Sequence, residues 1–295
     1  MKGEIVRART ADGLALEGLW AEPASAESGR TALLHIHGFG GNFYANPFVG
    51  EMGREATARG HAFLTANTRG HDSIAEIHRR NGNGGGYVMG GSAHEEFAAC
   101  LTDLDSWLDF LRERGRDRVV LCGHSAGAMK SAYYQATRQD VRVRALVFLA
   151  PPDLFGLQAA GFGARWAEDL RQATEWVNAG QGERLMPDGA SPYPISARTY
   201  VSYLSANSPA NVFNYAAPDA PFETIARLRQ PLLTVMGSED RTVLGDVAAC
   251  LARLKPHATR APRCDTVVIP GAAHGFAGHE AALAQAVGDW LDETA

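Results

Sequence analysis

Short apolar runs alternate along the chain with longer segments of helical periodicity, and this alternation restricts the fold more than any other feature. The apolar runs are TALLHIHG (31–38), HAFLTANTRG (61–70), RVVLCG (118–123), RALVFLAPP (144–152), PLLTVMGS (231–238) and DTVVIPG (265–271). Strands that are apolar throughout and separated by helices are typical of a parallel sheet covered on both faces. The sequence therefore predicts an α/β fold with a mainly parallel sheet.

Segments with one apolar face separate these runs. The clearest example has its apolar side chains at spacings of four, three, four and three residues, which place them on one face of a helix: Phe97, Leu101, Leu104, Leu108 and Leu111. Further helices are expected at 47–59, after residue 125, at 243–254 and from about residue 280. Two strand-like runs, at 4–9 and 14–20, precede them and are joined by Asp12-Gly13, a hairpin signal.

Charge and cysteine content limit the classes of function. The net charge of −5 argues against a nucleic-acid partner, because nucleic-acid binding needs a basic face. The four cysteines form no CxxC pair, which favours free thiols in a reducing cytoplasm. The polar first 20 residues, and the lack of any window near the ~18 apolar residues of a membrane span, predict a cytoplasmic protein with no membrane partner.

Two glycine-rich segments could be mistaken for phosphate-binding loops. In HGFGGNF (37–43), Phe43 stands where the dinucleotide fingerprint needs its third small residue, and no GK[ST] occurs in the chain. NGNGGGYVMGG (81–91) is interpreted as a loop. His71, Asp72 and His78 match no metal-ligand spacing. We therefore expect no nucleotide, metal or other cofactor.

A serine stands between two glycines where the strand at 118–123 meets the following helix, in GHSAG (123–127). This stretch fits G-x-S-x-G, and a strand before and a helix after are the context that the motif requires. One interpretation is a tight turn that merely needs small residues. The other is that Ser125 is a nucleophile held on a strained turn, with His124 beside it pointing away.

A serine hydroxyl is a poor nucleophile without a base. His274 follows the last predicted strand and is the expected base, whereas His279 is expected to face solvent. Asp240 follows the preceding strand and is placed to orient His274. The order Ser125, Asp240, His274 is that of the α/β-hydrolase architecture, with each residue at the carboxyl end of a strand, where ligands bind in open parallel sheets.

Two other carboxylates compete for the role of Asp240. Asp153 follows LAPP, at the end of an earlier strand. Glu239 is adjacent to Asp240 and is expected to face solvent. Asp240 is favoured because GSEDRTV (237–243) suits an acid-bearing loop.

Together these motifs resemble the α/β-hydrolase superfamily over essentially the whole chain, through LCGHSAG, GSEDRTV and GAAHGF. HGFGGN is similar to the corresponding loop of cinnamoyl and feruloyl esterases, and NTRGHD with GHSAGAMKSAYY also resembles the group that contains the fungal siderophore (fusarinine) esterases. The resemblance implies an α/β-hydrolase fold with an eight-stranded, mainly parallel sheet. It also implies an oxyanion hole made by the backbone N–H groups of Phe39 and Ala126.

Between the strands at 144–152 and 231–238 the chain is longer than one crossover helix needs. The surplus has helical patterns of its own and many aromatic residues, which suit either an apolar roof or a small core of its own. The resemblance implies a cap inserted at about 153–228, after the sixth strand, within a single domain at 1–295. The 80 residues at 151–230 carry six arginines and eight carboxylates, which do not form the basic entrance that a coenzyme A thioester would need.

The favoured function is therefore that of a serine carboxylesterase acting on a small, neutral, moderately apolar or aromatic ester. The same fold and residues do not dictate the leaving group. Hydrolysis of a lactone, thioester, amide or C–C bond stays open, as does a low-turnover ligand receptor of the same fold.

Overall fold

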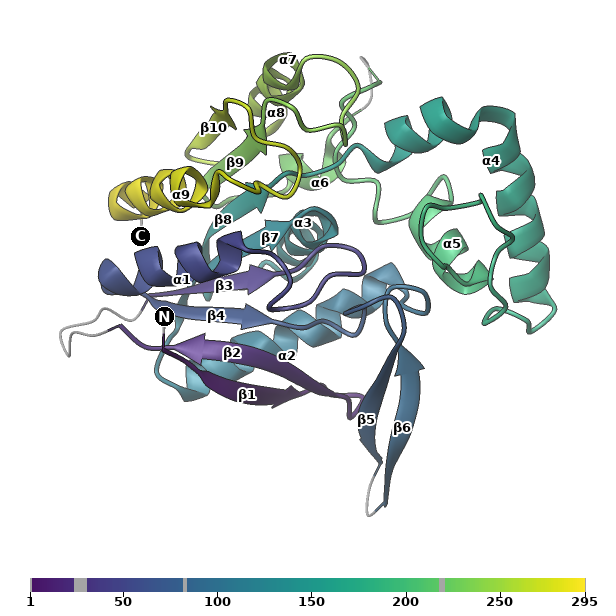
Figure 1. Ribbon diagram of the computed structural model, residues 1–295, viewed down its shortest axis with the longest axis horizontal. Coiled ribbons are helices and arrows are strands. Elements are labelled where there is room, and N and C mark those ends of the chain that lie inside the picture. Colours follow the sequence, from purple (N-terminus) through teal and green to yellow (C-terminus); the bar gives the residue numbers. More distant parts are fainter. Residues whose placement is uncertain (1, 24–30, 82–83, 218–220, 295) are drawn as a thin grey trace.

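The predicted apolar runs form the strands of one central sheet (Figure 1). The computed structural model describes residues 2–23, 31–81, 84–217 and 221–294. The eight strands lie in the order β1-β2-β4-β3-β7-β8-β9-β10. Their bounds are β1 (Glu4–Arg9), β2 (Ala15–Ala21), β3 (Thr31–Ile36), β4 (Ala62–Ala66), β7 (Arg118–His124), β8 (Val143–Leu149), β9 (Leu232–Gly237) and β10 (Cys264–Ile269). β2 pairs in antiparallel fashion with both β1 and β4, near one edge, and the other five strand pairs are parallel, so the predicted mainly parallel sheet is confirmed.

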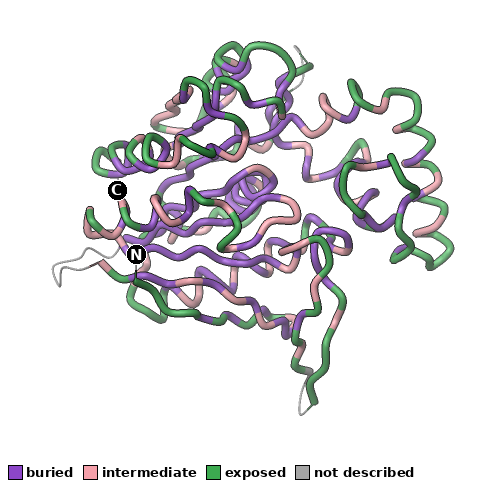
Figure 2. Tube along the Cα trace, viewed as in Figure 1, coloured by how far each residue is buried: buried purple, intermediate pink, exposed green. Residues whose placement is uncertain are grey.

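Helices cover both faces of this sheet, and further helices lie in the long connection between β8 and β9 (Figure 1). They are α1 (Phe48–Ala58), the short 3-10 helix η1 (Phe97–Ala99), α2 (Cys100–Glu113), α3 (Ala126–Arg138), α4 (Leu154–Asn178), α5 (Ala197–Leu204), α6 (Glu223–Ala226), α7 (Val247–Ala252), α8 (Leu254–His257) and α9 (Glu280–Thr294). Leu33 packs in a core with residues of α1 and α9, whereas its neighbour Leu34 packs in another with residues of α2 and α3. Both faces of the inner strands are thus buried (Figure 2), which explains their unbroken apolar runs.

The helix expected at 243–254 begins later than predicted and is divided into α7 and α8. The Asp246 side chain accepts a hydrogen bond from the Ala249 N–H at 2.8 Å and caps the first turn of α7. Gly245 directly before it has a φ of +93°, a conformation that ends the preceding loop rather than continuing a helix. The cap therefore moves the start of the helix to Val247.

The prediction of a loop at 81–91 is wrong, because most of that segment forms a strand. β6 (Gly84–Gly90) pairs in antiparallel fashion with β5 (Ala75–Asn81), while residues 82–83 lie outside the described residues. The hairpin extends away from the central sheet and is largely exposed (Figures 1 and 2). Glycine has little strand propensity of its own, so pairing with β5 organises this segment in a way that its composition does not predict.

The long connection between β8 and β9 contains α4, α5 and α6, with residues 218–220 outside the described residues. Figure 1 shows α4 and α5 on the side toward which the parallel strands point. Gly163, with a φ of +48°, interrupts α4 and divides it into two helical segments. Ala173 and Tyr200 are buried where α4 and α5 pack together. Within the part of the chain that the structure describes, no helix is long and apolar enough to cross a membrane.

The close packing of α3 on the sheet depends on two glycines. A Cβ added to Gly127 would lie 2.3 Å from the Ile36 carbonyl oxygen and 2.6 Å from that of His37. A Cβ added to Gly123 would lie 2.1 Å from the Gly127 carbonyl oxygen. These contacts are with backbone atoms, which cannot rotate away as a side chain can. Only glycine therefore lets β3, β7 and α3 converge at this point.

We expect Gly127→Ala to lower the free energy of unfolding by about 1–3 kcal/mol, because β3 and α3 must separate to admit the methyl group. Gly161→Ala is the matched control, since Gly161 lies in α4 with no heavy atom within 4 Å of an added Cβ. It should raise the free energy of unfolding by about 0.5–1 kcal/mol. Urea unfolding of the two variants measures both effects, and equal effects would contradict the packing argument.

Candidate active site

Ser125 lies on the sharp turn between β7 and α3 with φ 56° and ψ −122°, a sparsely populated conformation for a residue other than glycine. Its N–H donates to the Leu149 carbonyl at 2.8 Å, and its carbonyl accepts from the Ala128 N–H at 2.9 Å. These bonds hold the strained turn between β8 and the first turn of α3. The Ser125 side chain consequently lines a cavity at the carboxyl ends of the strands.

His274 bridges Ser125 and Asp240. Its Nε2 lies 3.0 Å from Ser125 Oγ, and its Nδ1 lies 3.1 Å from Asp240 Oδ2. The loop after β10 carries His274, and the loop after β9 carries Asp240. The structure thus brings together three side chains that are 34 and 149 residues apart along the chain from His274.

The side chain of Asp240 is fully buried. Its Oδ1 accepts hydrogen bonds from the N–H of Thr242 at 2.8 Å and from the hydroxyl of Thr242 at 2.7 Å. Burial by itself raises the pKa of Asp240, but the hydrogen bond and charge of His274, with the bonds from Thr242, outweigh it and hold that pKa below its ordinary value. An ionised Asp240 accepts the Nδ1 proton of His274, which leaves Nε2 free to accept a proton from Ser125.

Asp153, the rival carboxylate, is used differently. Its Oδ1 accepts from the Gly156 N–H at 2.8 Å and caps α4, while its Oδ2 accepts from the Ala216 N–H at 2.6 Å. Asp153 therefore ties the first turn of α4 to the chain near residue 216. Glu239, the other candidate, is exposed, as expected.

The peptide between Gly38 and Phe39 is held in a fixed orientation. His37 Nε2 accepts from the Thr68 N–H at 3.0 Å, so its Nδ1 carries the proton and donates to the Gly38 carbonyl at 2.8 Å. Burial, followed by the charge of Lys130, lowers the pKa of His37 well below its ordinary value. The Gly41 N–H also donates to the Gly38 carbonyl, at 3.1 Å. In a trans peptide the N–H points opposite to the C=O, so fixing this carbonyl fixes the direction of the Phe39 N–H.

Ala126 is the first residue of α3, so its N–H has no acceptor within the helix and lies at the positive end of the helix dipole. Phe39 and Ala126 both line the cavity that Ser125 lines. A Cβ added to Gly38 would lie 2.9 Å from Ser125 Cβ, so glycine allows the Phe39 loop to approach the serine this closely. Phe39 and Ala126 therefore both border the space beside the Ser125 side chain.

The cavity has a volume of about 560 Å³. It is lined by Gly38, Phe39, Gly40, Gly41, Asn46, His124, Ser125, Ala126, Met129, Pro152, Leu154, Leu157, Gln158, Phe162, Ser191, Pro192, Tyr193, Ile195, Tyr203, Leu204, Thr242 and His274. Of these described residues, none is Asp, Glu, Lys or Arg. Helices α4 and α5 supply much of the apolar wall, through residues such as Leu157, Phe162 and Leu204.

The model of the alpha/beta hydrolase family matches residues 33–286. The chain belongs to the alpha/beta hydrolase family. A comparison with curated proteins found no match. The eight-stranded, mainly parallel sheet with helices on both faces and helices inserted after β8, its sixth strand, confirms the predicted α/β-hydrolase fold.

Solved structures of other proteins share this fold. Est1E from Butyrivibrio proteoclasticus is 17% identical with a TM-score of 0.64, over 99% of both chains. DcsB, solved in complex with its substrate analogue, is 16% identical with a TM-score of 0.71, over 99% of both chains. The Pyrococcus furiosus esterase Pf2001 is 15% identical with a TM-score of 0.63, over 100% of this chain and 92% of its own. At this identity the likeness concerns the fold.

His124 contributes to the site of this alpha/beta hydrolase in a way that the sequence analysis missed. Its Nε2 lies 3.0 Å from the backbone carbonyl of His274, and the two rings are tilted by 42° with centroids 5.0 Å apart. Burial, followed by the charge of His274, lowers the pKa of His124 to about 4, so the neutral ring donates from Nε2 to that carbonyl. His124 thereby supports the loop that carries His274. The sequence feature that could have indicated this role of His124 is its position next to Ser125.

No group of three or more His, Cys, Asp or Glu side chains that could hold a metal ion occurs among residues 2–23, 31–81, 84–217 and 221–294. His71 and Asp72, two of the side chains considered above, pair with each other at 2.8 Å. His78 lies on the exposed hairpin, where its ring packs against Tyr87. The three therefore do not converge.

The lowered pKa of Asp240 predicts how its contribution to stability depends on pH. A carboxyl whose pKa is lower in the folded than in the unfolded state stabilises the fold above its unfolded pKa, and loses that effect as the pH falls through its folded pKa. The difference in free energy of unfolding between wild type and Asp240→Asn should therefore persist from pH 7 to about pH 5, and shrink below about pH 4. Urea unfolding across this range measures it, and a difference that keeps its full size below about pH 3 would contradict the assignment.

Proposed function

We propose that this alpha/beta hydrolase is a serine carboxylesterase in which Ser125 is the nucleophile, His274 the general base and Asp240 the carboxylate that orients His274. The observation that carries the proposal is the continuous set of contacts from Ser125 Oγ to His274 Nε2 at 3.0 Å and from His274 Nδ1 to Asp240 at 3.1 Å. These contacts lie at the wall of an apolar cavity, where a bound ester would be shielded from water.

In the proposed reaction, Ser125 Oγ attacks the ester carbonyl carbon while His274 Nε2 takes the serine proton, and Asp240 stabilises the imidazolium that forms. The negative oxygen of the tetrahedral intermediate accepts hydrogen bonds from the N–H groups of Phe39 and Ala126. Each such donor typically contributes ~10²–10³ in rate. The C–O bond then breaks, and His274 returns the proton to the departing alcohol. Water attacks the acyl-enzyme by the same proton route and releases the acid. The chain's own residues carry every step, without a metal or organic cofactor.

The lining of the cavity supports a small, neutral, moderately apolar or aromatic acyl group. Its aromatic members include Phe39, Phe162, Tyr193 and Tyr203, and no charged carboxylate, lysine or arginine is among its described lining residues. Est1E, which has this fold, has also been solved with ferulic acid bound, an aromatic acid. We propose that the insertion at about 153–228 acts as a cap, and that those of its side chains that line the cavity select the acyl group.

A fluorophosphonate should add its mass to the peptide that contains Ser125, and Ser125→Ala should abolish both labelling and hydrolysis of p-nitrophenyl butyrate. The expected loss in kcat is up to ~10⁶, because the nucleophile is removed. Ser131→Ala is the matched control. Ser131 lies on the same helix and is buried, and its hydroxyl has no hydrogen-bond partner among the described residues. Mass spectrometry and initial rates report the two outcomes.

Labelling that persists in Ser125→Ala would refute the nucleophile. The same assay tests the acyl group, because a hemisuccinate ester carries a carboxylate that the cavity cannot pair. Its kcat/KM should fall below that of the butyrate ester. A preference for the hemisuccinate would refute a neutral substrate.

Asp240→Asn should leave the fold intact and lower kcat by up to ~10⁴, because the amide stabilises the wrong tautomer of His274. Asp153→Asn should keep kcat per folded molecule, while losing about 1–3 kcal/mol in the free energy of unfolding, because the single amide oxygen can accept from only one of the Gly156 and Ala216 N–H groups. Steady-state kinetics and urea unfolding of the pair separate the two roles. If Asp240→Asn is active and Asp153→Asn is inactive, the carboxylate that orients His274 is Asp153, which follows β8, and not Asp240.

A further inference from the structure

A buried ion pair that the proposed reaction does not use lies between the sheet and the inserted helices. Lys130 Nζ lies 2.9 and 2.8 Å from the two oxygens of Glu95, and neither side chain is more than 1% exposed. A Cβ added to Gly70 would lie 1.9 Å from a Glu95 oxygen, so the carboxylate is tightly enclosed. Removing two charges from water is costly, and the attraction between them does not always compensate for it. A gain in stability therefore does not by itself explain why this ion pair is buried here.

The first connection from this pair runs through Tyr203 of α5. The Tyr203 hydroxyl donates to Glu95 Oε1, and burial, followed by the charge of Glu95, raises the pKa of Tyr203 well above its ordinary value, so the donor stays protonated. The ring of Tyr203 packs edge-on against the ring of Phe39, with centroids 5.3 Å apart and an interplanar angle of 85°. Glu95 thus holds the aromatic ring that bears on the Phe39 side chain.

The second connection runs through the backbone. Lys130 Nζ also donates to Thr68 Oγ1 at 3.2 Å. The Thr68 N–H donates to His37 Nε2 at 3.0 Å, and His37 Nδ1 donates to the Gly38 carbonyl at 2.8 Å. That carbonyl belongs to the same peptide as the Phe39 N–H. Both connections therefore end on Phe39, one on its ring and one on its peptide.

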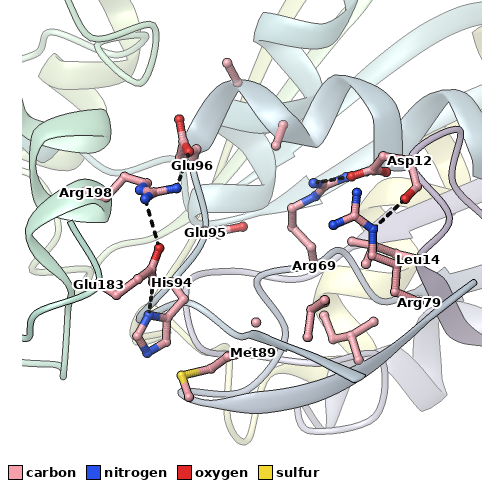
Figure 3. A pocket seen from close by; sticks show the side chains of 15 residues that line it. Asp12, Leu14, Arg69, Arg79, Met89, His94, Glu95, Glu96, Glu183 and Arg198 are labelled. Atoms are coloured by element: carbon pink, nitrogen blue, oxygen red, sulfur yellow. Dashed lines mark hydrogen bonds and ion pairs between the residues drawn. The ribbon is translucent and has the colours of Figure 1, made fainter. Parts of the chain in front are cut away.

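Glu95 is also among the residues that line a second cavity of about 760 Å³, shown in Figure 3. Several charged side chains there pair with one another, and Arg79 donates to the Asp12 backbone carbonyl. Arg198 lies 3.2 Å from Glu183, and Arg69 lies 3.0 Å from Asp12. Among the described residues, the hydrogen-bond partners of the Glu95 carboxylate are Lys130 and Tyr203. The ion pair thus serves the site around Ser125 and not the second cavity.

We propose that Lys130, Glu95 and Tyr203 act as positioning residues that hold the Phe39 N–H in place for the oxyanion. This inference rests on the proposed function. Because Tyr203 belongs to the insertion, the arrangement makes the orientation of one oxyanion donor depend on the docking of α5. A donor displaced by a fraction of an ångström stabilises the tetrahedral intermediate less, while it affects binding of the uncharged ester little.

The test is Tyr203→Phe, which removes the hydroxyl and keeps the ring. The number of active sites is first titrated with a fluorophosphonate, so that kcat refers to folded, competent molecules. We expect kcat for p-nitrophenyl butyrate to fall about 10- to 100-fold with KM unchanged. The affinity for phenylboronic acid, which forms a tetrahedral anion on the serine, should fall by a similar factor.

Tyr134→Phe is the matched control. It removes another buried hydroxyl that donates to carboxylates, Asp105 and Asp140, each at 2.9 Å, near the far end of α3. It should leave kcat, KM and boronate affinity as in wild type. Thr68→Val tests the second connection, since it removes the hydroxyl that contacts Lys130 Nζ at 3.2 Å and His37 Nε2 at 3.3 Å, and keeps the N–H that donates to His37. It should lower kcat and boronate affinity as Tyr203→Phe does. If Tyr203→Phe fails to fold, Thr68→Val is the variant that tests the positioning of the Phe39 N–H.

Wild-type kcat and boronate affinity in Tyr203→Phe would overturn the inference while leaving the proposed function intact. A loss confined to KM would also overturn it, because Tyr203 would then only line the acyl-binding cavity. A wild-type protein that neither labels with the fluorophosphonate nor hydrolyses esters would refute the proposed function, and this inference with it.

Discussion

The strained turn at Ser125 is the constraint on which the rest of the structure depends. Its backbone conformation persists because β3, β7, β8 and α3 meet there with no room for side chains at Gly123 and Gly127. The same convergence directs the first N–H groups of α3 toward the cavity and allows the Gly38 loop to contact the serine. A relaxed turn would separate these elements. Strain at one residue is thus maintained by the packing of an entire sheet.

Burial divides the histidines around this turn into two kinds. It lowers the pKa of His35 to about 3 and that of His124 to about 4, and it holds that of His37 well below its ordinary value. All three are neutral near pH 7, and they serve as fixed donors and acceptors for the backbone and for Thr65. His274 differs, because its side chain is 32% exposed and faces a buried carboxylate.

The insertion after β8 is attached to the core through polar contacts as well as apolar ones. Asp153 ties its first turn to Ala216, and the Tyr203 hydroxyl reaches the Glu95–Lys130 pair beneath the sheet edge. Its apolar side chains complete the cavity around Ser125. Proteins only 15–17% identical to this one share its fold. Selectivity within such a fold is therefore expected to reside in the insertion and in the loops at the strand ends.

The sequence by itself determined the alternation of strands and helices, the turn at 123–127 and the positions of Ser125 and His274 after strand ends, because these features are encoded by local periodicity and spacing. It favoured Asp240 as the carboxylate that contacts His274 but left Asp153 open, since both follow strand ends. Only the tertiary structure decided this, because in it the two Asp153 oxygens accept hydrogen bonds from backbone N–H groups and do not contact His274. It also decided the β5–β6 hairpin and the pairing of Lys130 with Glu95, 35 residues away. No local pattern specifies such partners, because they meet only when the sheet and the insertion pack.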